Sequence, residues 1–434
     1  MNLESEATGQ AQRAILVAAV TVRRGKAGGE DNLFTPEESL AELARLAETA
    51  GLVPVRTVIQ QRPAPHAAHF VGSGKAAELS ELGRELGCGL LICDDELTGA
   101  QLRNLEEATE LEVLDRSQLI LHIFAGRARS REGKLQVELA QLLYRLPRLT
   151  GRGVAMSRLG GGIGTRGPGE SKLETDRRTI RTRISELNDE IGELRQHRAL
   201  HRDSRRRAAL AVVALVGYTN AGKSTLLNRL TGSDVLAEDR LFVTLDPTTR
   251  SVDLPNGGQA LLTDTVGFIH KLPHMLVAAF RATLEEAAEA DLLCHVIDAS
   301  HPRALEQAAV VQRVLESIGA GARPSLAVLS KADLVPDAEL PRLAHSFPGA
   351  VTVSGATGQG IDHLLTAIEY ELRSRREDFV ATIPYARADL LSMLHAHGRV
   401  ESEDYGAAGV TVRATIDRPL AAKIRSELER GGRA

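Results

Sequence analysis

One short stretch, GYTNAGKS at residues 217–224, constrains the fold of this chain more than any other feature. It matches the pattern GxxxxGK[ST] and lies between an apolar run, AVVALV, and a segment typical of a helix, STLLNRL. Glycines in such a loop let backbone N–H groups turn toward phosphate, and the start of the following helix adds its dipole. The stretch therefore predicts a P-loop in an α/β domain that binds nucleoside phosphates.

The residue types of this loop indicate how each would act. We expect Lys223 to reach the β- and γ-phosphates and the Ser224 hydroxyl to bind Mg²⁺. The expected nucleotide-binding residues of the loop and the start of its helix are Gly217, Tyr218, Thr219, Asn220, Ala221, Gly222, Lys223, Ser224 and Thr225.

Two other glycine-rich stretches do not fit this pattern. GSGK at residues 72–75 has no glycine five residues before its final GK pair, so it predicts a turn and a helix start, with a secondary nucleotide contact left open. SRLGGGIGTRGPGE at residues 157–170 contains GxGxxG at Gly162, Gly164 and Gly167. A leucine-striped helix precedes it instead of a strand, which argues against a dinucleotide site.

Two further motifs follow the P-loop in the order expected of a nucleotide switch. LLTDTVGF contains DxxG, in which Asp264 would hold Mg²⁺ through water and the Gly267 N–H would sense the γ-phosphate, with Thr265 and Val266 between them. LFVTLDPTTR supplies the switch I segment, with Phe242, Val243, Thr244, Leu245 and Asp246 near the nucleotide. We favour Thr244 as the Mg²⁺ ligand, although the spacing also allows Thr248 or Thr249.

The base would be read by two later strand ends. In LAVLSKAD, the residues Ser330, Lys331, Ala332 and Asp333 stand where GTPases carry NKxD, and Asp333 would pair with the N–H groups on the guanine edge. VTVSGATG adds Ser354, Gly355 and Ala356 behind the base. The order of these motifs predicts GTP as substrate. Because Ser330 replaces the usual Asn, the base pocket is weaker, which leaves ATP open as a second substrate.

The remaining pattern predicts a multidomain α/β protein. Strand and helix patterns alternate to about residue 125, and two amphipathic helices near 131–148 and 170–205 then indicate a helical hairpin, ending in a linker at HRALHRDSRRRAA. The expected parts are a small parallel α/β domain at 1–125, the hairpin with its glycine-rich loop at 126–208, the P-loop GTPase domain at 209–374, and a small α+β domain at 375–434.

Composition limits the function classes. No apolar run approaches the ~20 residues that a membrane span requires, the N-terminus lacks the pattern of a signal peptide, and the three cysteines lack metal-ligand spacing. The net charge is −4, yet the hairpin region is rich in arginine, which favours RNA phosphate as a partner. Aromatic residues are only 3% of the chain, so base stacking is disfavoured. The expected RNA contacts are Arg158, Gly162, Gly164 and Arg166.

These motifs together resemble the HflX family, on the Obg-HflX branch of the translation-associated GTPases. The resemblance rests on GSGKAAEL, CDDELTGAQLRNLEEA, REGKLQVELAQLLYRLPRL, GGGIGTRGPGE, LETDRRTIRTRI, LDPTTR, DTVGFI, KLPH and AFRATLEEA, and covers nearly the whole chain. It implies a cytoplasmic, monomeric GTPase that binds the large ribosomal subunit and its RNA and splits stalled ribosomes under stress. Alternatives are a tRNA-modifying GTPase, a ribosome-biogenesis GTPase of the Obg type and a nucleotide-binding scaffold.

Hydrolysis would depend on Lys223, Thr244, Gly267 and Asn220. Phe268 stands where many GTPases place a water-orienting Gln, so we expect slow hydrolysis alone and stimulation by ribosomes. Asn220 resembles the P-loop asparagine that holds an activating K⁺ in related GTPases, although a local loop hydrogen bond would explain it equally well.

Overall fold

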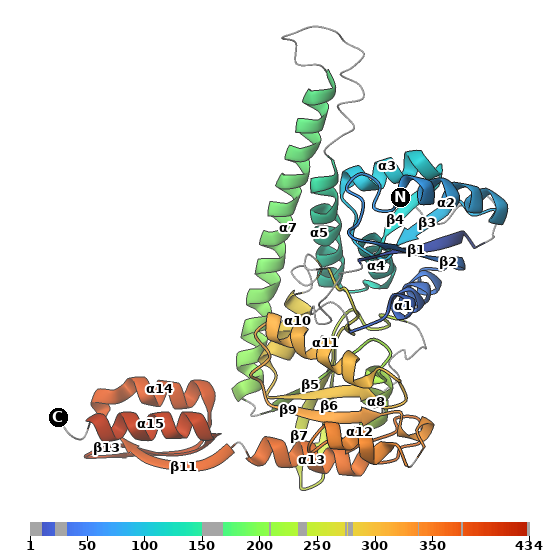
Figure 1. Ribbon diagram of the computed structural model, residues 1–434. Helices are drawn as coiled ribbons and strands as arrows, with labels where there is room; N and C mark the ends of the chain where they lie inside the picture. Colours follow the sequence, from blue (N-terminus) through green and yellow to red (C-terminus); the bar gives the residue numbers. More distant parts are fainter. Residues whose placement is uncertain are drawn as a thin grey trace. The chain divides into compact units, whose positions relative to one another are not determined.

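The computed structural model describes residues 11–21, 33–149, 168–207, 210–232, 241–273, 276, 281–336, 338–374 and 376–431 (Figure 1). The chain forms two compact units. The first comprises residues 1–192, 238–246 and 268–282, and the second comprises 193–237, 247–267 and 283–434. Two short segments that follow the P-loop in sequence therefore fold with the N-terminal unit.

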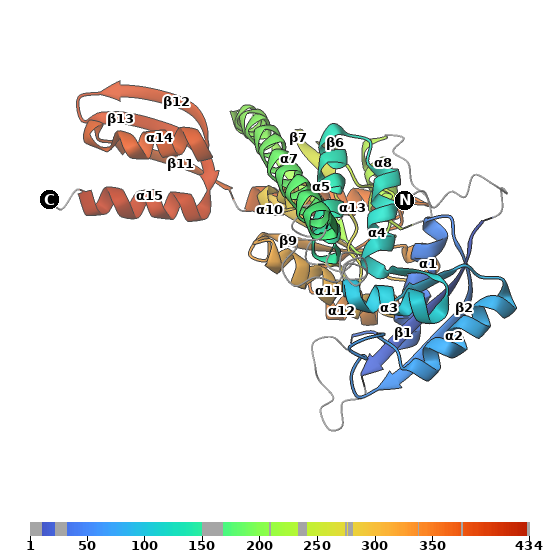
Figure 2. The ribbon, with the colours of Figure 1, turned by 90° about the horizontal axis from the view of Figure 1, so that it is seen from above.

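The first unit contains a four-stranded parallel sheet in the order β2-β1-β3-β4. Its strands are β1 (Arg13–Thr21), β2 (Val53–Arg62), β3 (Leu90–Cys93) and β4 (Glu112–Asp115), and its helices are α1 (Pro36–Thr49), α2 (Ser73–Leu86), α3 (Gly99–Thr109) and α4 (Arg116–Arg127). Ile15 and Val17 share a core with α2 and α3, whereas α1 and α4 pack against each other. The two helix pairs thus cover the sheet, as the alternating pattern predicts (Figure 2).

Helix α1 begins where its sequence indicates. The Thr35 hydroxyl accepts the Glu38 N–H at 3.2 Å, and the Glu38 carboxylate accepts the Thr35 N–H at 2.7 Å. This capping box satisfies two donors that a helix start leaves unpaired.

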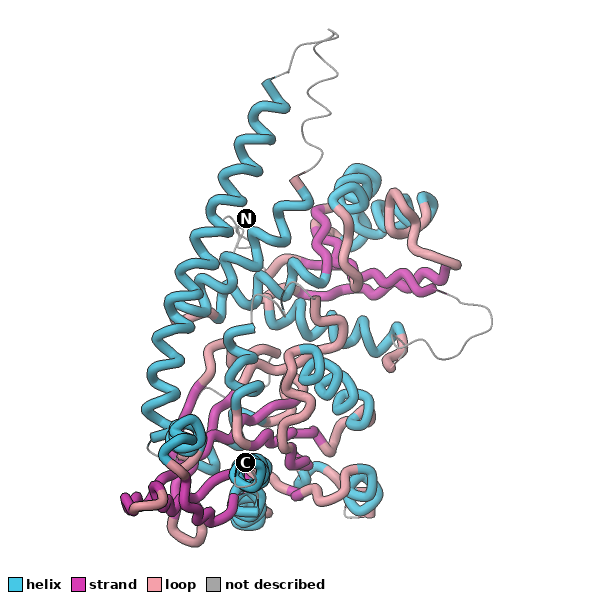
Figure 3. Tube along the Cα trace, turned by 90° about the vertical axis from the view of Figure 1, so that its left-hand side faces the viewer, coloured by secondary structure: helices cyan, strands magenta, loops and turns pink. Residues whose placement is uncertain are grey.

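Two long helices, α5 (Arg131–Arg148) and α7 (Pro168–Arg207), follow the small sheet. They lie side by side in Figures 1 and 3, joined by an ion pair between Arg183 and Glu138 at 2.8 Å. The second helix, expected near 170–205, is confirmed, and the stretch 197–207, expected to act as a linker, is its last part. That stretch contains no glycine or proline, so nothing in it ends the helix.

The second unit contains a six-stranded sheet in the order β10-β9-β8-β5-β7-β6. Its strands are β5 (Ala211–Gly217), β6 (Thr248–Leu254), β7 (Gly258–Asp264), β8 (Leu292–Asp298), β9 (Ser325–Ser330) and β10 (Val351–Thr352). Strand β6 is antiparallel to β7, and the other pairs are parallel. The carboxyl ends of β5, β7, β8 and β9 therefore meet at one edge, where an open α/β sheet binds ligands.

Helices cover both faces of this sheet. The core that contains Val296 and Val328 includes residues of α8 (Lys223–Thr231) and α13 (Ile361–Ser374). The next residues along the same strands, Ile297 and Leu329, pack instead with α11 (Ala304–Ser317) and α12 (Leu340–Ser346). Successive strand residues point to opposite faces, so the two helix pairs lie on opposite sides. Helix α10 spans Arg281–Glu289.

The C-terminal part is an antiparallel sheet in the order β11-β13-β12 with two helices. Its elements are β11 (Arg376–Ile383), α14 (Ala388–His397), β12 (Arg399–Gly406), β13 (Gly409–Asp417) and α15 (Arg418–Gly431). The α+β prediction is confirmed, but sequence reasoning missed β12. That strand reads RVESEDYG and lies at the sheet edge, so it lacks the apolar alternation that marks a half-buried strand.

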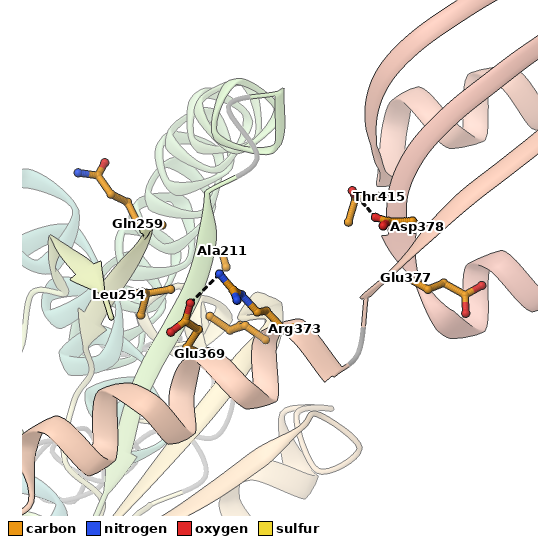
Figure 4. Close-up of a pocket in the computed structure, with 10 residues that line it drawn as sticks. Ala211, Leu254, Gln259, Glu369, Arg373, Glu377, Asp378 and Thr415 are labelled. Atoms are coloured by element: carbon orange, nitrogen blue, oxygen red, sulfur yellow. Dashed lines mark hydrogen bonds and ion pairs between the residues drawn. The ribbon is translucent and has the colours of Figure 1, made fainter. Parts of the chain in front are cut away.

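A hollow of about 350 Å³ in the second unit is not the predicted nucleotide site. Its lining includes Ala211, Leu254, Gln259, Glu369 and Arg373, and Figure 4 shows the Glu369–Arg373 ion pair that lies against it. None of the motif residues lines it. Among the described helices, none combines the length and apolar character needed to cross a bilayer.

Candidate nucleotide-binding site

The P-loop follows β5 directly and passes into α8. A side chain at Gly217 would collide with the Val296 carbonyl oxygen, so only glycine lets the loop run this close to β8. Gly222 has φ 88°, in the left-handed region, immediately before α8 starts at Lys223. Asn220, with φ 60°, also lies in the left-handed region, which Asn tolerates better than most residues. The local sequence thus explains the loop shape.

Lys223 is held inside this loop with 6% of its surface exposed. Its Nζ donates to the Gly217 carbonyl at 3.1 Å and to the Tyr218 carbonyl at 2.8 Å. An ammonium group has three protons, so these contacts leave one donor for a phosphate oxygen. Burial lowers the pKa of Lys223 to about 8, while Asp264 acts in the opposite direction. The positive charge is therefore destabilised until an anion binds beside it.

Ser224 and Asp264 form the second part of the site. The Ser224 hydroxyl lies 2.6 Å from the Asp264 carboxylate, which is fully buried at the end of β7. Thr265 donates to the Leu215 carbonyl at 2.7 Å and so links the end of β7 to β5. A hydroxyl and a carboxylate side by side form the oxygen donor set that Mg²⁺ prefers. The residues present therefore fit a magnesium site.

The glycine of DxxG packs tightly against the P-loop. A Cβ at Gly267 would lie 2.8 Å from the Thr219 Cα and 3.0 Å from the Lys223 Nζ. Any larger residue would have to displace the loop or the lysine. The structure thus brings Gly267 beside the residue expected to bind the γ-phosphate.

Ser330 contacts the P-loop although it is not the expected Asn. Its buried hydroxyl lies 2.7 Å from the Ala221 carbonyl and 3.0 Å from the Ile297 carbonyl. Because a hydroxyl has one proton, it donates to these two oxygens in turn or shares the proton between them. The link between β9 and the P-loop is thus present without an amide side chain.

The other residues expected to read the base lie around the same edge. Asp333 is exposed in the turn Ala332–Leu334, and the Lys331 Nζ pairs with Asp298 at 2.8 Å. Ser354 is fully buried, and its hydroxyl accepts the Thr357 N–H at 3.1 Å. A Cβ at Gly355 would lie 3.2 Å from the Thr225 Cγ2, so the second loop approaches the start of α8. The exposed Asp333 carboxylate is accessible to a base.

Sequence reasoning missed one residue close to this site. His295 lies in β8 opposite Val216, is 8% exposed, and has no hydrogen-bond partner for its Nε2 among the described residues. Burial, with a smaller effect from Lys223, lowers the pKa of His295 to about 4. It therefore stays neutral near the lysine. A lone histidine in an apolar strand carries no sequence signal that could have identified it.

The switch I residues Phe242, Val243, Thr244, Leu245 and Asp246 belong to the first unit, whereas Thr248 and Thr249 start β6 in the second. The Thr249 hydroxyl lies 2.9 Å from the Thr263 hydroxyl, across the β6–β7 pair. Thr248 is paired with Asp264, so Thr248 and not Thr249 shares the face of that carboxylate. The choice between Thr244 and Thr248 remains a prediction.

Comparison with known proteins identifies the family. Residues 37–125 match the GTP-binding GTPase N-terminal model, 127–205 the GTP-binding GTPase middle region, and 212–331 the 50S ribosome-binding GTPase model. The GTPase HflX of Caldanaerobacter subterraneus is 47% identical over 96% of this chain and 93% of its own length. The chain belongs to the HflX GTPase family.

Other relatives support the same assignment. The GTPase HflX of Lacrimispora saccharolytica is 46% identical over 95% of each chain, and that of Escherichia coli is 44% identical over 87% of this chain and 90% of its own. The resemblance found in the sequence is therefore confirmed. The chain is a P-loop GTPase that hydrolyses GTP.

The expected RNA contacts Arg158, Gly162, Gly164 and Arg166 lie outside the described residues. Other arginines of the hairpin region are used internally. Arg148 pairs with Glu96 at 3.0 Å and with Asp115 at 3.2 Å, and Arg183 pairs with Glu138 and Glu186. Part of the basic character that suggested RNA binding thus stabilises the unit itself.

Proposed function

We propose that this HflX-family GTPase acts in the cytoplasm on the large ribosomal subunit, and that GTP binding and hydrolysis drive the splitting or rescue of stalled ribosomes. The observation that carries the proposal is the match of residues 212–331 to a 50S ribosome-binding GTPase, together with a P-loop whose lysine is already held in place. The similar proteins are HflX GTPases, which favours this assignment over a tRNA-modifying or Obg-type GTPase.

In this mechanism the chain's own residues position the nucleotide. Lys223 donates to the β- and γ-phosphates while the Gly217 and Tyr218 carbonyls orient its Nζ. Ser224 and Asp264, the latter through water, would hold Mg²⁺ together with Thr244 from switch I. When bound, Mg²⁺ neutralises charge on the phosphate oxygens. Asp333 selects guanine, and Phe268 cannot orient water, so the ribosome would complete the site.

We place the RNA contact at the glycine-rich stretch of residues 157–170. Glycines permit close approach of the backbone to RNA, and Arg158 and Arg166 supply charge for its phosphates. The low aromatic content of the chain favours shape and backbone recognition over base stacking.

The test measures GTP and ATP turnover with and without purified large subunits, and co-sedimentation of the monomeric protein with those subunits at moderate salt. We expect large subunits to stimulate GTP hydrolysis. Charge reversal by Arg158→Glu and Arg166→Glu should weaken co-sedimentation and leave GTP affinity intact. Unchanged co-sedimentation would contradict the RNA contact, and turnover unaffected by large subunits would contradict the proposed function.

Asn220 supports a secondary proposal, that K⁺ stimulates hydrolysis modestly. Within the loop GYTNAGKS, Asn220 resembles the P-loop asparagine that holds an activating K⁺ in related GTPases. Equal rates in matched Na⁺ and K⁺ buffers, with and without ribosomes, would exclude this role.

A further inference from the structure

Residues 241–246, which include the switch I threonine, are anchored in the first unit on both sides of Thr244. Leu241, Phe242 and Leu245 are 3%, 2% and 2% exposed. The Phe242 ring packs edge-on against Phe124 of α4, with the ring centres 4.6 Å apart. Phe242 also has φ 56°, a conformation that a bulky residue adopts only when its surroundings impose it. This segment is therefore held by specific packing.

Asp246 attaches the same segment to the start of α5. Its carboxylate accepts the Arg129 N–H at 3.0 Å, the Ser130 N–H at 2.8 Å and the Ser130 hydroxyl. Ser130 is the N-cap residue of α5, and its hydroxyl also accepts the Gly133 N–H at 2.8 Å. A negative charge at a helix N-terminus is stabilised by the unpaired amides and the helix dipole. Ser130 therefore caps α5 and at the same time bonds to Asp246 of switch I.

Gly133 leaves the space that this contact needs. A Cβ at position 133 would collide with the Asp246 carboxylate. Glycine is a poorer helix former than alanine, so its presence in the first turn of α5 disfavours the helix itself. The room for Asp246 explains why a glycine lies there.

We propose that the start of α5 is the docking site for switch I, and that Asp246, capping α5 at Ser130, is a positioning residue that holds Thr244 ready for the GTP-bound state. In GTPases the γ-phosphate and its Mg²⁺ order switch I, and hydrolysis releases it. The cap, already formed in this structure, becomes more stable with GTP and loosens with GDP. Because the coupling between two sites is reciprocal, a change that stabilises the cap raises the affinity for GTP relative to GDP by the same factor. The inference rests on the role proposed above for Thr244.

Hydrogen exchange on the unmodified protein tests this directly. The amides of Arg129 and Ser130 donate to Asp246, so they should exchange about tenfold more slowly with a non-hydrolysable GTP analogue and Mg²⁺ than with GDP. Equal exchange in the two states would overturn the proposal. Because no ribosome is present, this outcome is separate from a failure of large-subunit binding, which would contradict only the proposed function.

A steric variant tests the coupling without removing any residue of the nucleotide site. Gly133→Ala should weaken binding of the GTP analogue about tenfold and leave GDP binding unchanged, since the new methyl group displaces Asp246 while favouring the helix. Gly126→Ala is the matched control, because a Cβ there meets nothing within 4 Å in α4.

An unchanged ratio of analogue to GDP affinity in Gly133→Ala would refute the coupling. Should that variant fail to fold, Ser130→Ala removes one of the three donors to Asp246 and should lower the ratio two- to fivefold, about the effect of one hydrogen bond. A ratio equal to that of the unmodified protein would then overturn the proposal.

Discussion

The P-loop and the switch segments are built in opposite ways. The Lys223 Nζ bonds to carbonyls five and six residues away, so residues 217–223 form most of their own environment. Asp246 instead bonds to residues 116 and 117 positions earlier, and the Lys271 side chain pairs with Asp94, 177 positions earlier. The phosphate-binding part is therefore local, whereas the segments that would respond to the γ-phosphate depend on the N-terminal unit.

A buried charge network anchors the segment after DxxG. Arg116 is 1% exposed, pairs with Glu42, donates to Asp94 at 2.8 Å, and donates to the His270 carbonyl at 3.0 Å. The Lys271 Nζ lies 2.6 Å from Asp94. Burial alone would raise the pKa of Asp94, but Arg116 and Lys271 together lower it. Two cations thus keep a fully buried carboxylate charged.

The largest expected effect is a loss of stability when the buried charge network around Asp94 is disrupted. Arg116→Leu leaves Asp94 buried with one cation fewer, and it should lower the free energy of unfolding by about 3–5 kcal/mol. Chemical denaturation of the nucleotide-free protein measures this. Arg84→Leu is the control, because Arg84 is largely exposed and pairs with Glu110 at 3.7 Å. A loss no greater than that of the control would refute the importance of the network.

The next largest effect is a loss of GTP turnover when the P-loop lysine is replaced. Lys223→Met removes the charge aimed at the phosphates and should lower GTP turnover by about 100-fold or more, while the fold stays intact. Lys75→Met is the matched control in GSGK, where the lysine pairs with Glu78 at 2.6 Å. Full turnover in the Lys75 variant is expected. An equal loss of GTP turnover in Lys223→Met and Lys75→Met would indicate that GSGK is a second nucleotide contact.

A smaller effect is the pH dependence of nucleotide affinity that the buried Lys223 should cause. Phosphate beside Lys223 raises its pKa from about 8, so binding takes up a proton above pH 8. Nucleotide affinity should therefore fall about tenfold per pH unit above 8 and stay flat below 7. Titration calorimetry in buffers of different ionisation enthalpy measures the uptake. Binding heats that do not depend on the buffer at pH 8.5 would exclude the shift.

The smallest expected effect concerns the link between β9 and the P-loop. Ser330→Ala removes a buried hydroxyl that reaches the Ala221 carbonyl and should weaken GTP binding about fivefold, or about 1 kcal/mol. Ser317→Ala is the control, because its hydroxyl caps only the exposed end of α11 at Val314. Unchanged affinity in Ser330→Ala would show that the P-loop needs no support from β9.

Local signals predicted the elements that consecutive residues encode. Thr35 and Glu38 mark the start of α1, and the glycines of GYTNAGKS mark the loop between β5 and α8. The charged strand β12 was missed because it has no apolar period that separates it from a loop.

The phosphate-binding and switch motifs could be identified from the sequence alone, because they are contiguous and their backbone geometry depends on neighbouring residues. The tertiary structure was needed to show that Asp246 caps α5, that Arg116 donates to the His270 carbonyl, and that Arg148 and Arg183 form ion pairs with residues of other elements. A carboxylate or guanidinium looks the same in sequence whether it faces solvent, RNA or a buried partner. Its role is settled by which distant residue the fold brings within hydrogen-bond distance.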